Sequence, residues 1–230
     1  MVMQSNQTSI VIQARMGSTR LPGKSMLPLG KTTVIGYLLK NLELSGFDRS
    51  QLCVATSDHQ ENLPLVQHVN ELGYRCIVGP EHDVLNRYQI AAREIDVRTI
   101  VRLTGDNPLI APSLVKSCID IHFRAGSILT STRRINPDRS ITRFVPKGSS
   151  VDIFEKEALM KINSDSCDDF DREHVVPVLF KQYQAKIAGA EELKSYGVDV
   201  DQIKAVSIDT HQDYKEACQR VNTENSGLLS

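Results

Sequence analysis

The stretch that most constrains this chain is residues 10–30, IVIQARMGSTRLPGKSMLPLG. It begins with a β-branched run, Ile10-Val11-Ile12, and then changes to a loop that carries glycines and cations. A short β-branched run bounded by such a loop is typical of a buried strand in an α/β sheet. Small residues let a ligand approach the backbone, and cations meet negative charge. We therefore expect a polyphosphate site at the carboxyl end of this first strand, where open α/β sheets bind ligands.

The loop after the first strand does not match the common phosphate-binding templates. It lacks the G-x-G-x-x-G spacing of dinucleotide-binding loops, and its Gly17 and Gly23-Lys24 miss the Walker A spacing by one residue. The lysine of a Walker loop also lies at the start of a helix. Here Pro28 would fall in the first turns of that helix, where it lacks the backbone N–H that donates a hydrogen bond. We predict an extended basic loop, followed by a helix over about residues 33–45 that begins with a threonine cap.

Composition describes an ordinary globular chain. Of the 230 residues, 40% are hydrophobic and 24% are charged, and the formal charge of −1 gives no general attraction to nucleic acid. No run approaches the length of a membrane span, and the first residues do not resemble a signal peptide. Five cysteines without a C-x-x-C pair favour reduced thiols. These features predict a single cytoplasmic domain over residues 1–230 with no nucleic-acid or membrane partner.

Strand-like and helix-like runs alternate along the first half of the chain. The expected strands are residues 10–12, 52–56, 74–78, 99–103 and 128–132, and the expected helices are residues 33–45, 60–72, 83–95 and 112–125. Four strand-then-helix repeats favour a doubly wound, mostly parallel sheet. The fold class is therefore predicted to be α/β.

A second candidate motif follows the fourth expected strand, where residues 104–110 have the sequence TGDNPLI. Asp106 comes just after the strand end, so it should lie at the same sheet edge as the first loop. One or two carboxylates together with substrate phosphates are the usual ligands of Mg²⁺. Asp106 is thus a candidate metal ligand, and the alternative is that it only caps the following turn.

The run QARMGSTRLPGK over residues 13–24 resembles the signature loop of sugar-nucleotide cytidylyltransferases, in particular the SpsF-like branch of spore-coat polysaccharide biosynthesis. That branch is related to the CMP-KDO and acylneuraminate cytidylyltransferases. The resemblance implies a three-layer, Rossmann-like nucleotide-diphospho-sugar transferase fold. In this fold a β-rich excursion leaves a mostly parallel sheet.

The resemblance also implies site residues. Arg15, Lys24 and Asp106 would be catalytic. The implied nucleotide-binding residues are Gln13, Ala14, Arg15, Gly17, Ser18, Arg20, Lys24, Asp83, Arg87, Thr104 and Asp106. For Asp83 and Arg87 a second interpretation stays open, in which Asp83 caps a helix and Arg87 is solvated.

The SIDT run near the end of the chain resembles the closing strand of the family, V-D-T-P-E-D. By that resemblance residues 206–210 would form a strand before a helix over about residues 212–221. Asp209 would then supply the second metal carboxylate beside Asp106, with Mg²⁺ as the cofactor. His211 stands where the family usually has proline, and an N-cap is the alternative role of Asp209.

Residues 133–180 are expected to form the excursion that shapes the sugar site and helps to build a homodimer. The family pattern P-D-G-L-D-V-E-V-F corresponds here to PKGSSVDIF, so Ser150 replaces one acid and Asp152 replaces the glutamate. The later REHV run resembles a segment that borders the acceptor. The implied substrate-binding residues are Asp152, Glu173 and His174.

Together these features predict transfer of CMP from CTP to an acidic 2-keto sugar for surface polysaccharide biosynthesis. Two alternatives remain. A glycosyltransferase of related fold would consume a sugar nucleotide, but no clear D-x-D motif follows the fourth strand. A non-catalytic nucleotide-binding homologue is suggested by the departures at Ala111, Ser150 and His211.

Overall fold

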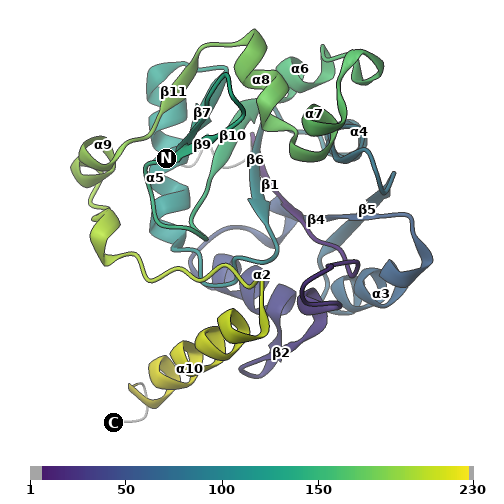
Figure 1. Cartoon of the computed structure of the whole chain (residues 1–230). Coiled ribbons are helices and arrows are strands. Elements are labelled where there is room, and N and C mark those ends of the chain that lie inside the picture. Colours follow the sequence, from purple (N-terminus) through teal and green to yellow (C-terminus); the bar gives the residue numbers. More distant parts are fainter. Residues whose placement is uncertain (1–6, 228–230) are drawn as a thin grey trace.

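A seven-stranded sheet forms the centre of the computed structural model, which describes residues 7–227, with side chains described to residue 223 (Figure 1). The strand order is β11-β7-β10-β6-β1-β4-β5, and β1 pairs in parallel with both β4 and β6. Only β10 runs antiparallel to its neighbours in this sheet. The strand bounds are β1 Thr8–Gln13, β4 Leu52–Ser57, β5 Arg75–Gly79, β6 Thr99–Thr104, β7 Leu129–Ser131, β10 Asp152–Glu155 and β11 Ala185–Ile187. The predicted mostly parallel α/β sheet is confirmed.

Helices cover both faces of the sheet, which gives the predicted three layers. One face packs against α2 (Val34–Leu44), α3 (Leu63–Glu71), α5 (Pro112–Ala125) and α9 (Ala190–Ser195). The other face packs against α4 (Val84–Glu94), α6 (Lys156–Met160) and α8 (Val176–Gln182), with α7 (Asp169–His174) against α4. Short 3₁₀ turns lie at Lys24–Met26, Arg49–Gln51, Gln60–Asn62, Ser164–Ser166 and Val200–Gln202.

The first strand is buried because its side chains enter both cores. Ile10 and Ile12 pack on the α2 side, whereas Val11 packs on the α4 side, and all three are almost fully inaccessible. A continuous apolar run therefore suits this position better than an alternating one would. The following helix begins as predicted, because the hydroxyl of Thr33 accepts a hydrogen bond from the Gly36 N–H.

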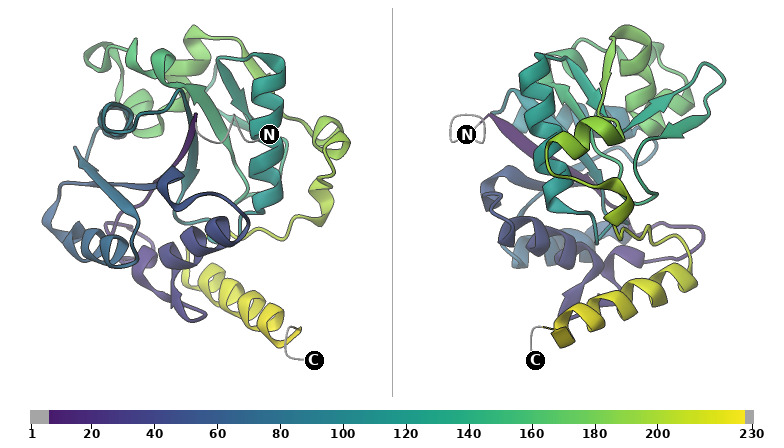
Figure 2. Two further views of the ribbon diagram at one scale, coloured as in Figure 1. Left: turned by 180° about the vertical axis from the view of Figure 1, so that it is seen from behind. Right: turned by 90° about the vertical axis from the view of Figure 1, so that its left-hand side faces the viewer.

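The excursion after β7 consists of one small hairpin. Strands β8 (Arg133–Ile135) and β9 (Ile141–Arg143) pair with each other and protrude from the body of the molecule (Figure 2). The chain then returns as β10, which inserts between β6 and β7. The predicted excursion at residues 133–180 is therefore β-rich only as far as β10, which belongs to the central sheet, and its second half consists of helices α6, α7 and α8.

The predicted closing strand at residues 206–210 is wrong. Among the described residues this segment pairs with no strand, and its Ile208 N–H donates to the Asp106 carbonyl at 2.8 Å. The reason is that β10 already occupies the edge of β6 that a closing strand would need. The segment crosses the strand ends instead and leads into α10 (His211–Gly227), which projects from the body (Figure 1).

Helix α10 is fixed to the body by a third, smaller apolar cluster. Val206, Ile208, Ala217 and Val221 pack there against Leu29 and Val34. Leu29 belongs to a two-stranded ribbon of β2 (Pro28–Leu29) and β3 (Thr32–Thr33). The C-terminal helix therefore holds the segment with Asp209 against the ribbon that follows the basic loop.

Within residues 7–227, no helix is long and apolar enough to cross a membrane, and the five cysteines form no disulfide.

A buried histidine makes stability depend on pH. His122 of α5 is 1% exposed, with Nδ1 2.9 Å from the Thr130 hydroxyl and Nε2 3.1 Å from a Glu155 oxygen. Burial lowers the pKa of His122 below its ordinary value near 6.5, although Glu155 opposes the change. The folded state therefore binds fewer protons than the unfolded state, so this stability is lost as pH falls below the unfolded value.

We expect the free energy of unfolding of the wild-type protein to fall between about pH 7.5 and 5.5 more steeply than that of His122→Gln, by up to about 1.4 kcal/mol per pH unit below 6.5, and the Tm to fall with it. Differential scanning calorimetry at several pH values measures this. His82→Gln, at an exposed histidine, is the control and should keep the wild-type slope. Equal slopes for wild type and His122→Gln would contradict the assignment.

Candidate active site

A cavity of about 390 Å³ opens at the carboxyl ends of β1 and β6. Most of the residues predicted for the site meet there. Its lining comprises Gln13, Ala14, Arg15, Ser18, Thr19, Arg20, Lys24, Ser25, Arg102, Thr104, Asp106, Glu173, His174 and Asp209. Residues from four separate parts of the sequence thus share one polar cavity.

The basic loop, residues 14–24, is held in its extended form by backbone contacts. The Met16 N–H donates to the Asn62 side chain at 2.8 Å, and the Met16 carbonyl accepts from the N–H groups of Ser18 and Gly23. Gly23 has a φ of 70°, a conformation that favours glycine. The chain then forms only one 3₁₀ turn at Lys24, so the loop does not open into a helix as a Walker loop does.

The Lys24 ammonium joins two carboxylates that are far apart in the sequence. Its Nζ lies 3.0 Å from Asp106 Oδ2, 3.5 Å from Asp209 Oδ1 and 2.7 Å from the Ile208 carbonyl oxygen. Arg20 also reaches Asp209, at 3.1 Å, and Lys147 reaches its other oxygen at 2.8 Å. Three cations thus surround two acids, and of this cluster Arg20, Lys24, Asp106 and Asp209 line the cavity.

The charges of the cluster keep Asp209 ionised. Partial burial acts to raise the pKa of this carboxyl group, but the hydrogen bond from Lys147 and the positive charges of Lys24, Lys147 and Arg20 outweigh it and lower the pKa. Asp106 is brought into the cluster by the tight turn before it. A Cβ on Gly105 would lie only 2.9 Å from Ala14 Cβ, so only glycine lets the two loops approach this closely.

The two carboxylates fit a divalent cation that is also bound by a substrate. Asp106 Oδ1 is buried and has no hydrogen-bond partner in the described part of the chain. Residues 7–227 contain no group of three or more Asp, Glu, His or Cys side chains that could hold a metal by themselves. Mg²⁺ is commonly bound by one or two carboxylates plus substrate phosphates, and Asp106 with Asp209 provides that set.

A row of polar side chains crosses the sheet beside the cavity. We define this polar row as Gln13, Arg102, Asp152, Ser131 and Arg133. Arg102 donates to Gln13 Oε1 at 3.0 Å and to the Asp152 carboxylate at 3.1 Å. The same carboxylate accepts from Arg133 at 2.6 Å and from the Ser131 hydroxyl at 2.7 Å. Burial acts to raise the pKa of Asp152, but the two guanidinium groups outweigh it, so its pKa is lowered and it stays ionised.

Sequence reasoning missed Arg102. The available signal was an arginine in an apolar strand, TIVRLT, where a charged side chain needs a buried partner. Sequence reasoning assigned Asp152 to direct substrate contact. The structure places its carboxylate, 1% exposed, among the arginines, and it does not line the cavity.

Three further predicted residues lie away from the cavity. Asp83 caps α4 by accepting from the Asn86 N–H at 2.8 Å. Arg87 is not solvated, because it is fully buried and donates to the carbonyls of Pro80 and Glu81. Gly17 faces the Glu61 side chain. Their predicted nucleotide contacts stay predictions.

Glu173 and His174 lie in the cavity wall at the end of α7. The His174 ring packs against Phe170 with centroids 4.5 Å apart. The next residue, Val175, is buried and has a φ of 65°, an unusual conformation for a β-branched residue. This turn ends α7 and directs the chain into α8.

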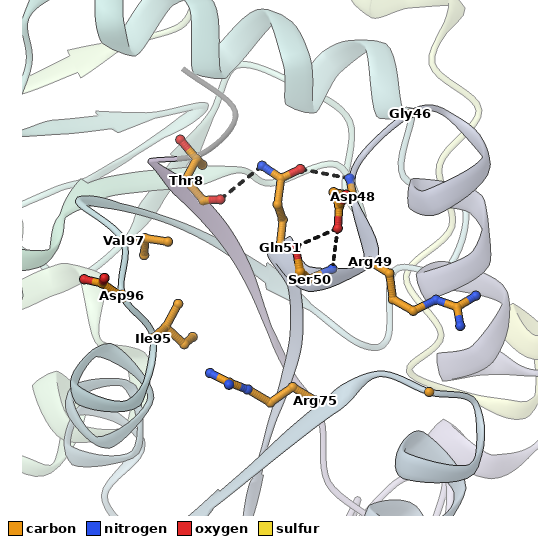
Figure 3. Close-up of a pocket in the computed structure, with 11 residues that line it drawn as sticks. Thr8, Gly46, Asp48, Arg49, Ser50, Gln51, Arg75, Ile95, Asp96 and Val97 are labelled. Carbon is orange, nitrogen blue, oxygen red and sulfur yellow. Dashed lines mark hydrogen bonds between the residues drawn. The ribbon is translucent and has the colours of Figure 1, made fainter. Parts of the chain in front are cut away.

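A larger cavity, of about 860 Å³, lies at the opposite end of the sheet (Figure 3). Several of its polar groups bond to one another: Gln51 links the Thr8 carbonyl to the Asp48 N–H, and Asp48 accepts from Ser50. None of the predicted site residues lines it. The cavity at the carboxyl ends of the strands is therefore the candidate active site.

The sheet, the basic loop and the paired carboxylates define an α/β protein that binds an anionic ligand at its strand ends. Residues 9–223 match the cytidylyltransferase family. The chain belongs to this family and is thereby a nucleotidyltransferase, as the signature loop predicted.

Similarity to individual proteins agrees with this assignment. The chain is 41% identical over 128 residues to the spore coat polysaccharide biosynthesis protein SpsF of Bacillus subtilis, a match that spans 54% of this chain and about half (53%) of that protein. It superimposes on a cytidylyltransferase from Leptospira borgpetersenii with a TM-score of 0.77 and 29% identity, covering 92% of this chain and 85% of the other. A CMP-2-keto-3-deoxy-manno-octonic acid synthetase complexed with CTP shares the fold, with a TM-score of 0.69, 15% identity, and 95% and 99% coverage.

The polar row makes Asp152 important for stability. Asp152→Asn should lower the free energy of unfolding by about 3–5 kcal/mol, because it leaves Arg102 and Arg133 buried without their counter-charge. The matched control is Asp168→Asn, which removes an exposed pair with Arg139 and should cost less than about 1 kcal/mol. Urea denaturation measures both. A loss for Asp152→Asn no larger than that of the control would contradict the assignment.

Proposed function

We propose that this protein transfers a cytidylyl group from CTP to an acidic 2-keto sugar and releases pyrophosphate. The main observation in support is that the Lys24 ammonium, at the end of the basic loop, contacts both Asp106 and Asp209. Cations that suit a triphosphate and carboxylates that suit a metal ion therefore lie in one cavity. The product would be a CMP-sugar for surface polysaccharide biosynthesis.

In the proposed reaction a hydroxyl oxygen of the sugar forms a bond to the α-phosphorus of CTP. The bond from that phosphorus to the bridging oxygen breaks, pyrophosphate leaves, and the hydroxyl proton is released to solvent. Arg15, Arg20 and Lys24 would bind the triphosphate and stabilise the charge that develops on the leaving group. Arg15 suits this role because its side chain is exposed at the cavity and forms no ion pair within residues 7–227.

We assign Mg²⁺ to Asp106 and Asp209. When bound, the ion would neutralise phosphate charge and so reduce repulsion toward the attacking oxygen. The unpartnered Oδ1 of Asp106 supports this assignment, since it offers an acceptor that no protein group uses. Thr104 and Ser18 line the same cavity and would contact the nucleotide.

The acidic acceptor is proposed from the family and from the charge of the site. The related synthetase of similar fold is named for a 2-keto sugar acid, and Arg102 brings a further positive charge to the cavity wall. Glu173 and His174 border the same region. We also propose a homodimer that uses the excursion at residues 133–180, because its hairpin protrudes from the body (Figure 2).

The direct test is pyrophosphate release from each of the four nucleoside triphosphates with Mg²⁺, against a panel of 2-keto sugar acids. We expect release with CTP and one acid, and loss of release when a chelator removes the metal. Release with another nucleotide would keep the transferase class and discard cytidine. CTP binding without release with any acid would support a non-catalytic homologue.

Lys24→Ala should lower kcat/KM for this reaction by on the order of 10²-fold or more, because the charge that stabilises the transition state is lost. The matched control is Lys186→Ala, since Lys186 pairs with Glu192 on the surface away from the cavity. The control should keep wild-type activity. Unchanged turnover of Lys24→Ala in the same assay would remove Lys24 from the catalytic group.

A further inference from the structure

The polar row fixes the orientation of one amide in the cavity wall. Arg102 can only donate hydrogen bonds, so the Gln13 atom 3.0 Å from its Nη2 must be the oxygen. The Gln13 amide nitrogen is then left with two donors. In the part of the chain that the structure describes, this nitrogen has no hydrogen-bond partner, and Gln13 lines the cavity. The amide therefore offers donors to a ligand.

Strand register makes this orientation rigid. Asp152 of β10 lies directly opposite Arg102 of β6 and Ser131 of β7. The Asp152 carboxylate in turn holds two guanidinium groups, those of Arg102 and Arg133. Gln13 is thus positioned by a chain of buried contacts that crosses four strands. A group held in this way loses little conformational entropy when it binds a ligand.

The polar row carries more positive than negative charge. Arg102 and Arg133 share the single carboxylate of Asp152, which leaves one net positive charge, and the buried Nε of Arg102 has no partner among the described residues. Arg102 lines the cavity, so this positive charge lies at the cavity wall. Burial lowers the pKa of His174, Glu173 opposes the change, and Arg102 and Arg133 lower the pKa further. Glu173 itself is exposed at the cavity mouth, where water screens its charge.

Within the described residues, no side-chain hydrogen bond or ion pair joins the row to the cluster of Lys24, Asp106 and Asp209. The cluster of Lys24, Asp106 and Asp209 is joined to the C-terminal segment through the Ile208 carbonyl. The row instead extends from β1 through β6 and β10 to β7, on the sheet face that packs against α4, because Tyr88 of α4 lies beside Arg102. The cavity wall therefore carries two separately bonded groups: the cluster around Lys24, here called the phosphate end, and Gln13 with Arg102, here called the donor-rich end.

We propose that Gln13 is a specificity-determining residue that donates to the carboxylate of the acceptor sugar, and that Arg102, Asp152 and Arg133 position it. This inference rests on the proposed function, and it moves Gln13 from the predicted nucleotide contacts to the acceptor. Two amide donors and a net positive charge suit a carboxylate, whereas an ester or a hydroxyl at the same place gains less from them.

Gln13→Glu is a sharp test because the introduced carboxylate can still accept from Arg102, so the buried contact survives. The change removes the amide donors and places a negative charge at the donor-rich end. We expect affinity for an acidic acceptor to fall on the order of 10- to 100-fold, while affinity for CTP changes less than about twofold. Gln13→Met removes the donors without adding charge and should give a smaller loss for the acid.

The measurement is isothermal titration of wild type and both variants with 3-deoxy-manno-octulosonate, N-acetylneuraminate and their methyl esters, and separately with CTP. Melting temperatures taken in parallel show whether the variants are folded. The inference is supported if the wild type binds an acid more tightly than its ester, and if Gln13→Glu loses this preference while it still binds CTP. A loss of CTP affinity with acid binding unchanged overturns it, as does a wild type that binds neither acid better than its ester.

This experiment separates the inference from the proposed function. If acid binding depends on Gln13 as expected but no pyrophosphate is released, the proposed reaction fails and the acceptor assignment stands. If pyrophosphate is released from CTP with an acid whose binding and KM are unaffected by Gln13→Glu, the reaction stands and the acceptor assignment fails.

Discussion

The parallel pairing of β1 with β6 is the constraint on which the site depends. Gln13 and Thr104 lie opposite each other in this register, so the basic loop and the turn with Asp106 leave the sheet at the same level. The Gly105 N–H donates to the Gln13 carbonyl at 2.8 Å and extends the pairing by one residue into the turns. Because both strands are buried on both faces, neither loop can shift without disturbing the core.

The second constraint is that β10 occupies the outer edge of β6. This placement excludes a closing strand and sends residues 206–210 across the strand ends, where Asp209 reaches Lys24. The same strand carries Asp152, which neutralises Arg102 inside the sheet. One antiparallel insertion therefore shapes both the phosphate end and the donor-rich end of the cavity.

Local signals explain what could be predicted from the sequence. The helix over residues 112–125 was placed correctly because Pro112 suits a first helical turn and Gly126 ends the helix with a φ of 58°. Lys24, Asp106 and Asp209 were found because each belongs to a short motif, and the structure brings them together.

Non-local geometry explains what was missed. The pairing of Arg102 with Asp152 depends on which strand lies beside β6, and a single sequence carries no record of that register. The strand β11 over Ala185–Ile187 was not predicted, since three residues leave too little periodicity to detect. The closing strand was expected from resemblance, and the occupied edge of β6 prevented it.

The internally paired cluster around Lys24 has a consequence for how ligands assemble in the site. Its cations pair with one oxygen of Asp106 and both oxygens of Asp209, so a triphosphate that takes the cations would release these oxygens to a metal ion. Each ligand would free the groups that the other needs. By thermodynamic reciprocity, nucleotide and metal would then each raise the affinity for the other to the same extent. The protein would thus select the metal–nucleotide complex over either component alone.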